Sequence, residues 1–323
     1  MHKHFYFNFV NSTNPSNLKC DKMKRILSVL TILVFTAMVH AQEPSDTLWR
    51  FNGVTSLNFS QLALVNWAAG GEGSLAGNAR VDLSAAYMSS DEKVSWNNDL
   101  ILGYGLIRQG DAENPFVKSD DKIDLASKFG YKASKMWYYT GLLNFRTQFD
   151  KGYANPRDID DRIPISEFMA PGYLNLSFGM DYKPSKTFTI LLAPLTGKMT
   201  FVRNDSLANL GAFGVKPGQN TRSEFGGYVK IAFTKELMKN VRLNTKIDLF
   251  SNYLENPQYV DVNFDLLLTL KVNEYISASL ITQLIYDYDI KFDILDATGE
   301  PTGEVEPRIQ LKELFGVGLT YNF

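Results

Sequence analysis

The chain ends with an alternating stretch that runs to its last residue, Leu314-Phe315-Gly316-Val317-Gly318-Leu319-Thr320-Tyr321-Asn322-Phe323. Every second residue from Phe315 onward is a large apolar or aromatic one, and the residues between are Gly, Thr or Asn. Successive side chains of a β-strand point to opposite faces, so this stretch has one apolar and one small or polar face. The pattern is typical of a membrane barrel, in which apolar side chains meet lipid and polar ones meet the lumen.

The same stretch resembles the C-terminal assembly signal of bacterial outer-membrane proteins, which ends in an aromatic residue and has alternating apolar positions. The resemblance implies that Leu319, Tyr321 and Phe323 form an assembly signal. It also implies two partners, the lipid of the outer membrane and the barrel-assembly machinery. Leu314 departs from the pattern, because a polar residue is usual at that position.

The first 41 residues have the features of a secretory signal peptide that follows an upstream start. Met23-Lys24-Arg25 is basic, residues 26–39 are apolar, and Val39-His40-Ala41 resembles a cleavage site. A membrane anchor is the alternative, but the apolar run of about 14 residues is shorter than the ~20 that a spanning helix needs. We therefore expect residues 1–22 to be a mis-start without a fold, 23–41 a signal peptide, and 42–323 an outer-membrane β-barrel.

Removal of this segment limits the chemistry of the mature chain. His2, His4, His40 and Cys20 are the only histidines and cysteine, and all lie within it. Disulfides, thiolate nucleophiles, Cys/His metal sites and histidine bases are then excluded. We expect no enzyme activity, no cofactor, and no catalytic or metal site; a carboxylate dyad stays open, although no pair of acids stands out.

The charge of the mature chain disfavours nucleic acid as a partner. The chain has 33 basic and 35 acidic residues, of which five basic and one acidic precede residue 42, which leaves a net charge of about −6.

Alternation with a period of two recurs along the mature chain, for example over residues 241–249 and 260–266. Periodicity alone leaves open a soluble sandwich, whose apolar face would form a core. The signal peptide, the terminal Phe323 and the strand lengths favour an all-β, transmembrane, antiparallel up-and-down barrel of about 12 strands. The expected strands are 47–59, 74–89, 94–108, 120–134, 136–150, 172–183, 187–203, 222–234, 241–253, 259–272, 275–291 and 307–323.

The expected connections alternate in length, as the turns and loops of a membrane barrel do. Short ones cover 89–93, 133–135, 184–186, 235–240 and 272–274, and long ones cover 109–119, 151–171, 204–221 and 294–306. The connection 254–258 is an exception, because it is short where a long one is expected. An even number of strands predicts that both termini are periplasmic. Aromatic residues near the short turns predict an interfacial girdle, with generic β-propensity as the alternative.

Residues 61–72 interrupt the alternation with the stretch Asn66-Trp67-Ala68-Ala69-Gly70-Gly71. On this stretch the chain resembles an uncharacterised, domain-of-unknown-function family of outer-membrane barrels from Bacteroidota. Asn66, Trp67, Gly70 and Gly71 are expected to form a mouth loop that either folds into the barrel or makes an ordinary loop tip. The resemblance gives no information about chemistry.

Charged residues on the polar faces of the expected strands are candidates for the lumen lining. They are Arg80, Asp82, Asp99, Lys122, Asp124, Lys128, Arg146, Glu224, Lys230, Arg242, Lys246, Asp248, Asp261, Asp265, Asp287 and Asp289. In a channel such charges set ion preference, whereas in a closed barrel they pair and fill the interior. Twelve strands lie between the filled barrels of ~8 strands and the open pores of ~16.

The sequence therefore predicts an outer-membrane barrel of a Gram-negative bacterium, most simply a narrow passive channel for small polar solutes. The alternative is a non-conducting structural or accessory barrel of a larger envelope assembly. Its signs would be a lumen closed by ion pairs and a lipid-facing patch where a partner docks. The sequence does not identify a substrate.

Overall fold

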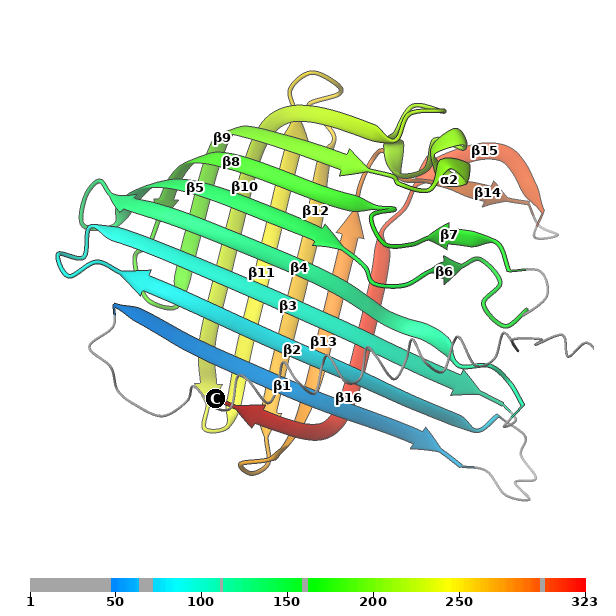
Figure 1. Cartoon of the computed structure of the whole chain (residues 1–323), viewed down its shortest axis with the longest axis horizontal. Coiled ribbons are helices and arrows are strands. Elements are labelled where there is room, and N and C mark those ends of the chain that lie inside the picture. The colour runs from blue at the N-terminus through cyan, green and yellow to red at the C-terminus, as the bar shows by residue number, and fades with distance from the viewer. Residues whose placement is uncertain (1–47, 64–71, 111–112, 159–161, 297–299) are drawn as a thin grey trace, which may run out of the picture. The chain divides into compact units, whose positions relative to one another are not determined.

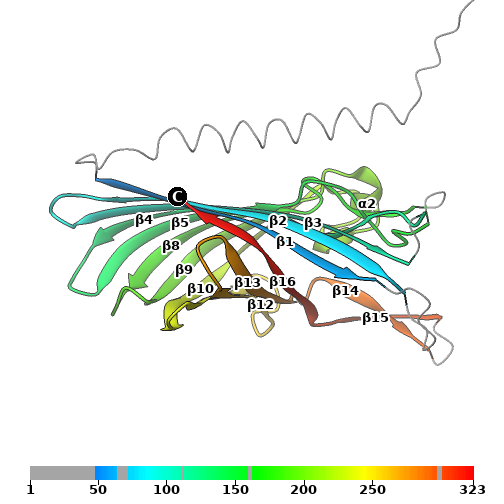
Figure 2. The same cartoon turned by 90° about the horizontal axis from the view of Figure 1, so that it is seen from below.

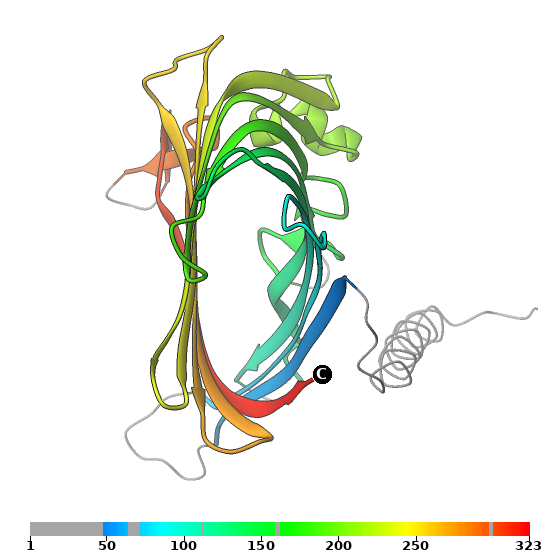
Figure 3. The same ribbon diagram turned by 90° about the vertical axis from the view of Figure 1, so that its left-hand side faces the viewer.

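A computed structural model of the protein describes residues 48–63, 72–110, 113–158, 162–296 and 300–323. Its main element is one closed antiparallel sheet, in which each strand pairs with the next along the chain and β1 pairs with β16. Figure 1 shows the strands from blue to red around the wall, and Figure 3 shows them closing into a ring. Residues 1–47 lie outside the described residues, and they include the expected mis-start (1–22) and signal peptide (23–41).

The strands of the ring are β1 Trp49–Leu62, β2 Ser74–Met88, β3 Val94–Gln109, β4 Val117–Lys132, β5 Trp137–Thr147, β8 Gly172–Tyr182, β9 Phe188–Phe201, β10 Thr221–Met238, β11 Val241–Asn252, β12 Val260–Lys271, β13 Ile276–Tyr286 and β16 Gln310–Asn322. These are the twelve expected strands, most of them with bounds shifted by a few residues. The expected fold class, an antiparallel up-and-down barrel, is confirmed, and the sandwich alternative is wrong because the strands form a single closed sheet.

The long connections contain small elements that the sequence analysis did not predict. One holds the hairpin of β6 Gly152–Tyr153 with β7 Pro164–Ser166, and another the hairpin of β14 Lys291–Leu295 with β15 Pro301–Pro307. Between β9 and β10 lie the helix α2 Asp205–Asn209 and the turn η1 Ala212–Gly214. We call the end of the barrel that carries these elements the long-loop end. No helix among the described residues is long and apolar enough to cross a bilayer.

One expected strand is too long. Residues 275–291 were predicted as one strand, but β13 ends at Tyr286. The Asp287 side chain then accepts a hydrogen bond from the backbone N–H of Asp289 at 2.9 Å, and the Asp287 carbonyl accepts one from Ile290 at 3.2 Å. An aspartate that bonds the backbone two residues ahead favours a turn over a strand, and here it ends the strand.

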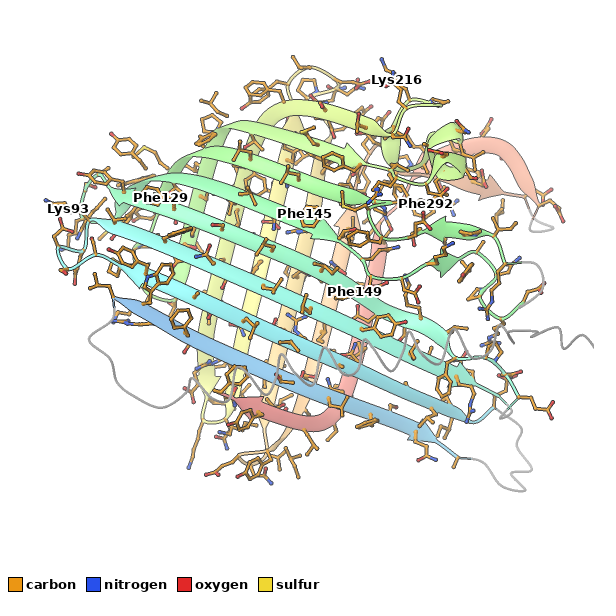
Figure 4. All side chains as sticks on the ribbon, viewed as in Figure 1. Lys93, Phe129, Phe145, Phe149, Lys216 and Phe292 are labelled. Atoms are coloured by element: carbon orange, nitrogen blue, oxygen red, sulfur yellow. The ribbon has the colours of Figure 1, made fainter. Side chains whose placement is uncertain are left out.

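The distribution of polarity is the reverse of that in a soluble protein. Large apolar side chains are exposed on the outside of the wall, for example Tyr139 at 59 % and Phe315 at 63 %. Figure 4 shows Phe129 and Phe145 on this wall, Lys93 at the opposite end from the long loops, and Phe292 in the loop region. Buried positions include many polar and charged side chains, such as Asp124, Lys198 and Asp248. This arrangement suits lipid outside and a polar interior.

Two glycines on neighbouring strands provide a test of the wall's packing. A Cβ on Gly179 of β8 would collide with the Leu192 carbonyl oxygen of β9, whereas a Cβ on Gly197 of β9 would meet nothing within 4 Å. We expect Gly179→Ala to lower the free energy of unfolding by ~1–3 kcal/mol, because overpacking forces the backbone to move. Gly197→Ala, the matched control, should change it by less than ~0.5 kcal/mol. Urea unfolding of the lipid-folded barrel, followed by tryptophan fluorescence, measures both; equal effects would contradict the packing argument.

Candidate functional site: the charged barrel interior

Ion pairs between strands that are not neighbours identify the interior face of the wall, because such side chains can meet only inside a closed barrel. Lys122 of β4 lies 3.2 Å from Asp265 of β12, and Arg146 of β5 pairs with Asp248 of β11. Alternation and register extend this face to the other predicted lumen residues that lie in strands. The predicted lumen candidates therefore share one face.

One enclosed group, which we call the central network, consists of Lys122, Asp124, Arg146, Lys230, Asp248 and Asp265. Asp248 is its hub, since it accepts hydrogen bonds from Arg146, from Lys230 at 2.8 Å and from the Tyr228 hydroxyl at 2.6 Å. Arg146 also lies 3.4 Å from Asp124, which lies 3.7 Å from Lys122. The Asp248 side chain is only 6 % exposed, so the network joins opposite walls at a closely packed level.

A second group, the long-loop cluster, surrounds Lys198 of β9. The Lys198 ammonium lies 2.7 Å from Asp261, 3.5 Å from Glu224 and 3.7 Å from Asp287. Arg222 of β10 joins the same group through Glu224 at 3.4 Å and Asp289 at 2.8 Å. Four carboxylates therefore face two cations, and this end of the interior carries excess negative charge.

The sequence analysis missed Lys198, although the cation holds this cluster together. It lies in the alternating stretch Thr196-Gly197-Lys198-Met199-Thr200, which carries the correct signal. The preceding apolar run, Leu191 to Leu195, obscures the alternation because a β-bulge between β8 and β9 shifts the register there. Assigning the inward and outward faces separately before and after this apolar run would have placed Lys198 in the interior.

Two smaller groups complete the interior. At the end of the barrel opposite the long loops, which we call the short-turn end, Asp181 lies 2.8 Å from Lys128 and 3.5 Å from Lys183. The Asp181 side chain is fully buried. Near β1, Arg80 pairs with Asp82 at 2.8 Å, while Asp120 accepts hydrogen bonds from Asn78 at 3.0 Å and from Lys312 of β16. Asp181, Asp120 and Lys312 were not among the predicted residues. The structure leaves three predicted residues, Asp99, Arg242 and Lys246, without an ion pair among the described residues.

The other candidate residues lie elsewhere. Asn66, Trp67, Gly70 and Gly71 of the expected mouth loop lie outside the described residues. Leu319 and Tyr321 of the expected assembly signal are on the outer face of β16, 57 % and 44 % exposed, and Phe323 follows that strand directly. Within the described part of the chain, no group of three His, Cys, Asp or Glu side chains is arranged to hold a metal ion.

One comparison finds that part of the chain is similar to a family without a known function. Residues 59–153 match the family described as "Protein of unknown function (DUF3078)". No curated protein matches the chain. The match covers the part of the barrel from the end of β1 to β6 and agrees with an uncharacterised domain family.

Solved structures of outer-membrane barrels are also similar. The translocator domain of the autotransporter NalP from Neisseria meningitidis matches with 10% identity and a TM-score of 0.35, covering 94% of this chain and 98% of that one. The COG4313 outer membrane channel from Pseudomonas putida F1 matches with 12% identity and a TM-score of 0.37, covering 88% and 97%. The NanC porin matches with 9% identity and a TM-score of 0.34, covering 83% and 98%. The fold of this chain is defined by its own strand register.

The central network makes a prediction about stability. Asp248→Asn should lower the free energy of unfolding by about 3–5 kcal/mol, because it leaves Lys230 enclosed with a neutral partner and Arg146 with Asp124 alone. Asp82→Asn is the matched control: it also removes one carboxylate from an interior ion pair, but the Asp82 side chain is 29 % exposed, so we expect ~1 kcal/mol or less. Chemical unfolding in the same lipid measures both variants. If both variants lose the same free energy of unfolding, the enclosure of the central network does not add to the stability of the barrel.

Proposed function

We propose that this chain is a narrow passive channel of a bacterial outer membrane, which admits small polar solutes and has the central network as its constriction. The observation that carries the proposal is the cross-barrel contact of Lys122 with Asp265, because it joins walls that face each other across the lumen. The Asp265 side chain is 26 % exposed, so the interior is not completely filled beside this contact. Solutes would pass by exchanging contacts with mobile ion-paired side chains, without an energy source.

The location in an outer membrane is supported by the outside of the wall. Apolar side chains cover it, and aromatic rings gather at the short-turn end. The ring centroids of Trp49 and Tyr87 are 5.3 Å apart there, and those of Trp137 and Tyr182 are 4.8 Å apart. Amphipathic rings prefer the boundary between lipid and water. We infer that this end marks the periplasmic interface and that the long-loop end faces outward, as the asymmetry of short turns and long loops favours.

A second candidate, a non-conducting accessory barrel, is favoured by the same ion pairs if they hold the lumen shut. The two functions differ in whether the side chains of the central network move aside to let a solute pass. An electrical measurement separates them, because a plugged barrel inserts into a bilayer without opening a conducting path.

Removing both partners of one cross-barrel pair tests the constriction. We expect Lys122→Ala with Asp265→Ala to raise single-channel conductance in a planar bilayer by roughly two-fold or more, since the pair narrows the path. Truncating both partners together avoids an unpaired charge in the interior. The control is Lys93→Ala with Asp91→Ala, an exposed ion pair at 3.4 Å in a short turn. If the wild type and the double variant are folded but silent, the channel is ruled out and the accessory barrel is supported.

The long-loop cluster makes a prediction about ion preference. Its excess of carboxylates should favour cations, so neutralising Asp287 and Asp289 with Asn should move the reversal potential in a KCl gradient toward zero. The control is Glu304→Gln with Glu306→Gln, which removes the same charge from the hairpin strand β15. An unchanged reversal potential in the first variant would show that the cluster does not line the conducting path.

A further inference from the structure

A short row of large apolar side chains interrupts the polar inner face of the barrel. Leu267 of β12 pairs with Ile281 of β13, which pairs in turn with Leu314 of β16. Leu267 lies two residues from Asp265, whose contact with Lys122 identifies the inner face, so these side chains point inward as well. Figure 2 shows β12, β13 and β16 side by side. We call Leu267, Ile281 and Leu314 the apolar row.

The apolar row is not part of a buried core. All three side chains are partly exposed, and neither of the buried apolar clusters, one around Leu142 and one around Val202, includes them. Leu314 is also the residue that departs from the C-terminal assembly pattern, in which a polar side chain is usual. Apolar surface that is exposed in a polar interior is stabilised when another apolar group covers it. The row therefore offers a place for the apolar part of a ligand.

Two cations without ion pairs border this row on β11. The register pairs Asn244 with Leu267, and Arg242 and Lys246 precede and follow Asn244 on the same face. Arg242 is exposed and Lys246 is partly exposed, and neither forms an ion pair with another described residue. Glu236 of β10 lies beside Arg242 in the register and forms no ion pair with it. Four residues of a strand span about 13 Å, so both long side chains can reach a charged group placed over Asn244.

The other charges at the short-turn end of the interior also favour an anion. Arg50 of β1 and Lys271 of β12 lie on the inner face there, without an ion pair among the described residues. The Asp181 carboxylate is shared by two lysines. Asp99 is a further inward carboxylate without an ion pair in the described part of the chain. Cations therefore outnumber carboxylates around the apolar row, which is the reverse of the balance in the long-loop cluster.

The apolar row and its two cations lie on the short-turn side of the central network. The strand β11 starts at the short-turn end, and Arg242 and Lys246 precede Asp248 along it. The strand β12 ends there, and Leu267 follows Asp265. A solute that enters from the short-turn end therefore reaches these residues before it meets the central network. The long-loop cluster, whose excess of carboxylates repels anions, lies beyond that network.

The spacing of the strands indicates the size of the ligand. Neighbouring strands lie ~4.8 Å apart, so the apolar row extends about 10 Å across β12, β13 and β16, and the cations follow one strand further. A straight alkyl chain of medium length matches this row. A carboxylate at the β11 end of such a chain would accept charge-assisted hydrogen bonds from the Arg242 guanidinium and the Lys246 ammonium.

We propose that the apolar row, with Arg242 and Lys246, is a binding site for a small organic anion that carries an apolar chain. The row covers the chain, and the two cations hold the anionic group. Since the site is reached from the short-turn end without passing the central network, the proposal does not depend on whether the barrel conducts.

Calorimetric titration of octanoate into the full chain, folded in phosphatidylcholine nanodiscs, tests the proposal. The heat measured with empty nanodiscs is subtracted to remove partition into lipid. We expect one octanoate per barrel. Acetate, which lacks the apolar chain, and octyltrimethylammonium, which has the chain but the opposite charge, should each bind at least about ten times more weakly.

The role of the two cations is tested by removing both. Arg242→Gln with Lys246→Gln should weaken octanoate binding by about ten-fold or more, because the carboxylate loses its charged donors. The matched control is Arg50→Gln with Lys132→Gln, which removes two cations from the same end of the interior, on β1 and β4 rather than beside the row. It should leave binding nearly unchanged, whereas equal weakening would show that only the general field of this end attracts the anion.

The role of the apolar row is tested without a change of charge, so this test also serves if the cation variant fails to fold. Ile281→Asn should weaken octanoate binding by about five-fold. The control is Ile285→Asn, the same substitution on the same strand and face, on the long-loop side of the row; it should leave binding unchanged. The proposal is overturned if octanoate does not bind, if octyltrimethylammonium binds as tightly, or if either variant has the same effect as its control.

Discussion

Backbone hydrogen bonding is the constraint on which the rest of this structure depends. A sheet that crosses a bilayer has no water to satisfy its edges, so it must pair its first strand with its last. Here β1 pairs with β16, and each of the strands between pairs with both neighbours. Closure then fixes the two faces of every strand, because alternation sends one set of side chains outward and the other inward. The reversed polarity of this protein follows from that geometry.

Closure also brings charges together that the chain separates widely. Lys122 and Asp265 come from strands that face each other across the ring, and Arg146 meets Asp248 in the same way. Buried charges are tolerated only when paired and hydrogen-bonded, and Asp248 meets this condition with three donors.

The interior has two levels that differ in charge balance. The central network is closely balanced and enclosed, whereas the long-loop cluster around Lys198 has more carboxylates than cations. If the barrel conducts, as we propose, a solute that enters from the long loops meets negative charge before it reaches the central network.

The strands could be predicted from the sequence because their signals are local. Alternation needs only neighbouring residues, and the Gly-, Pro- and Asp-rich loops mark where it stops, so the bounds of strands such as β11 were nearly correct. The end of β13 was wrong because one side-chain hydrogen bond, from Asp289 to Asp287, turns the chain within an otherwise suitable pattern. Which interior charges meet could not be predicted at all. Arg146 and Asp248 are 102 positions apart, and their contact depends on the register of every strand between them.

The terminal strand shows how one pattern can serve two physical ends. Gly316 and Gly318 fit the small, lumen-facing positions that alternation predicts for a barrel strand. In the structure they also let β1 approach β16 closely, since a side chain at either position would contact β1. That close approach completes the ring near the C-terminal end of β16, where Val54–Phe59 of β1 pair with Asn322–Val317. The same two glycines therefore satisfy the alternation of the strand and the steric demand of closing the sheet.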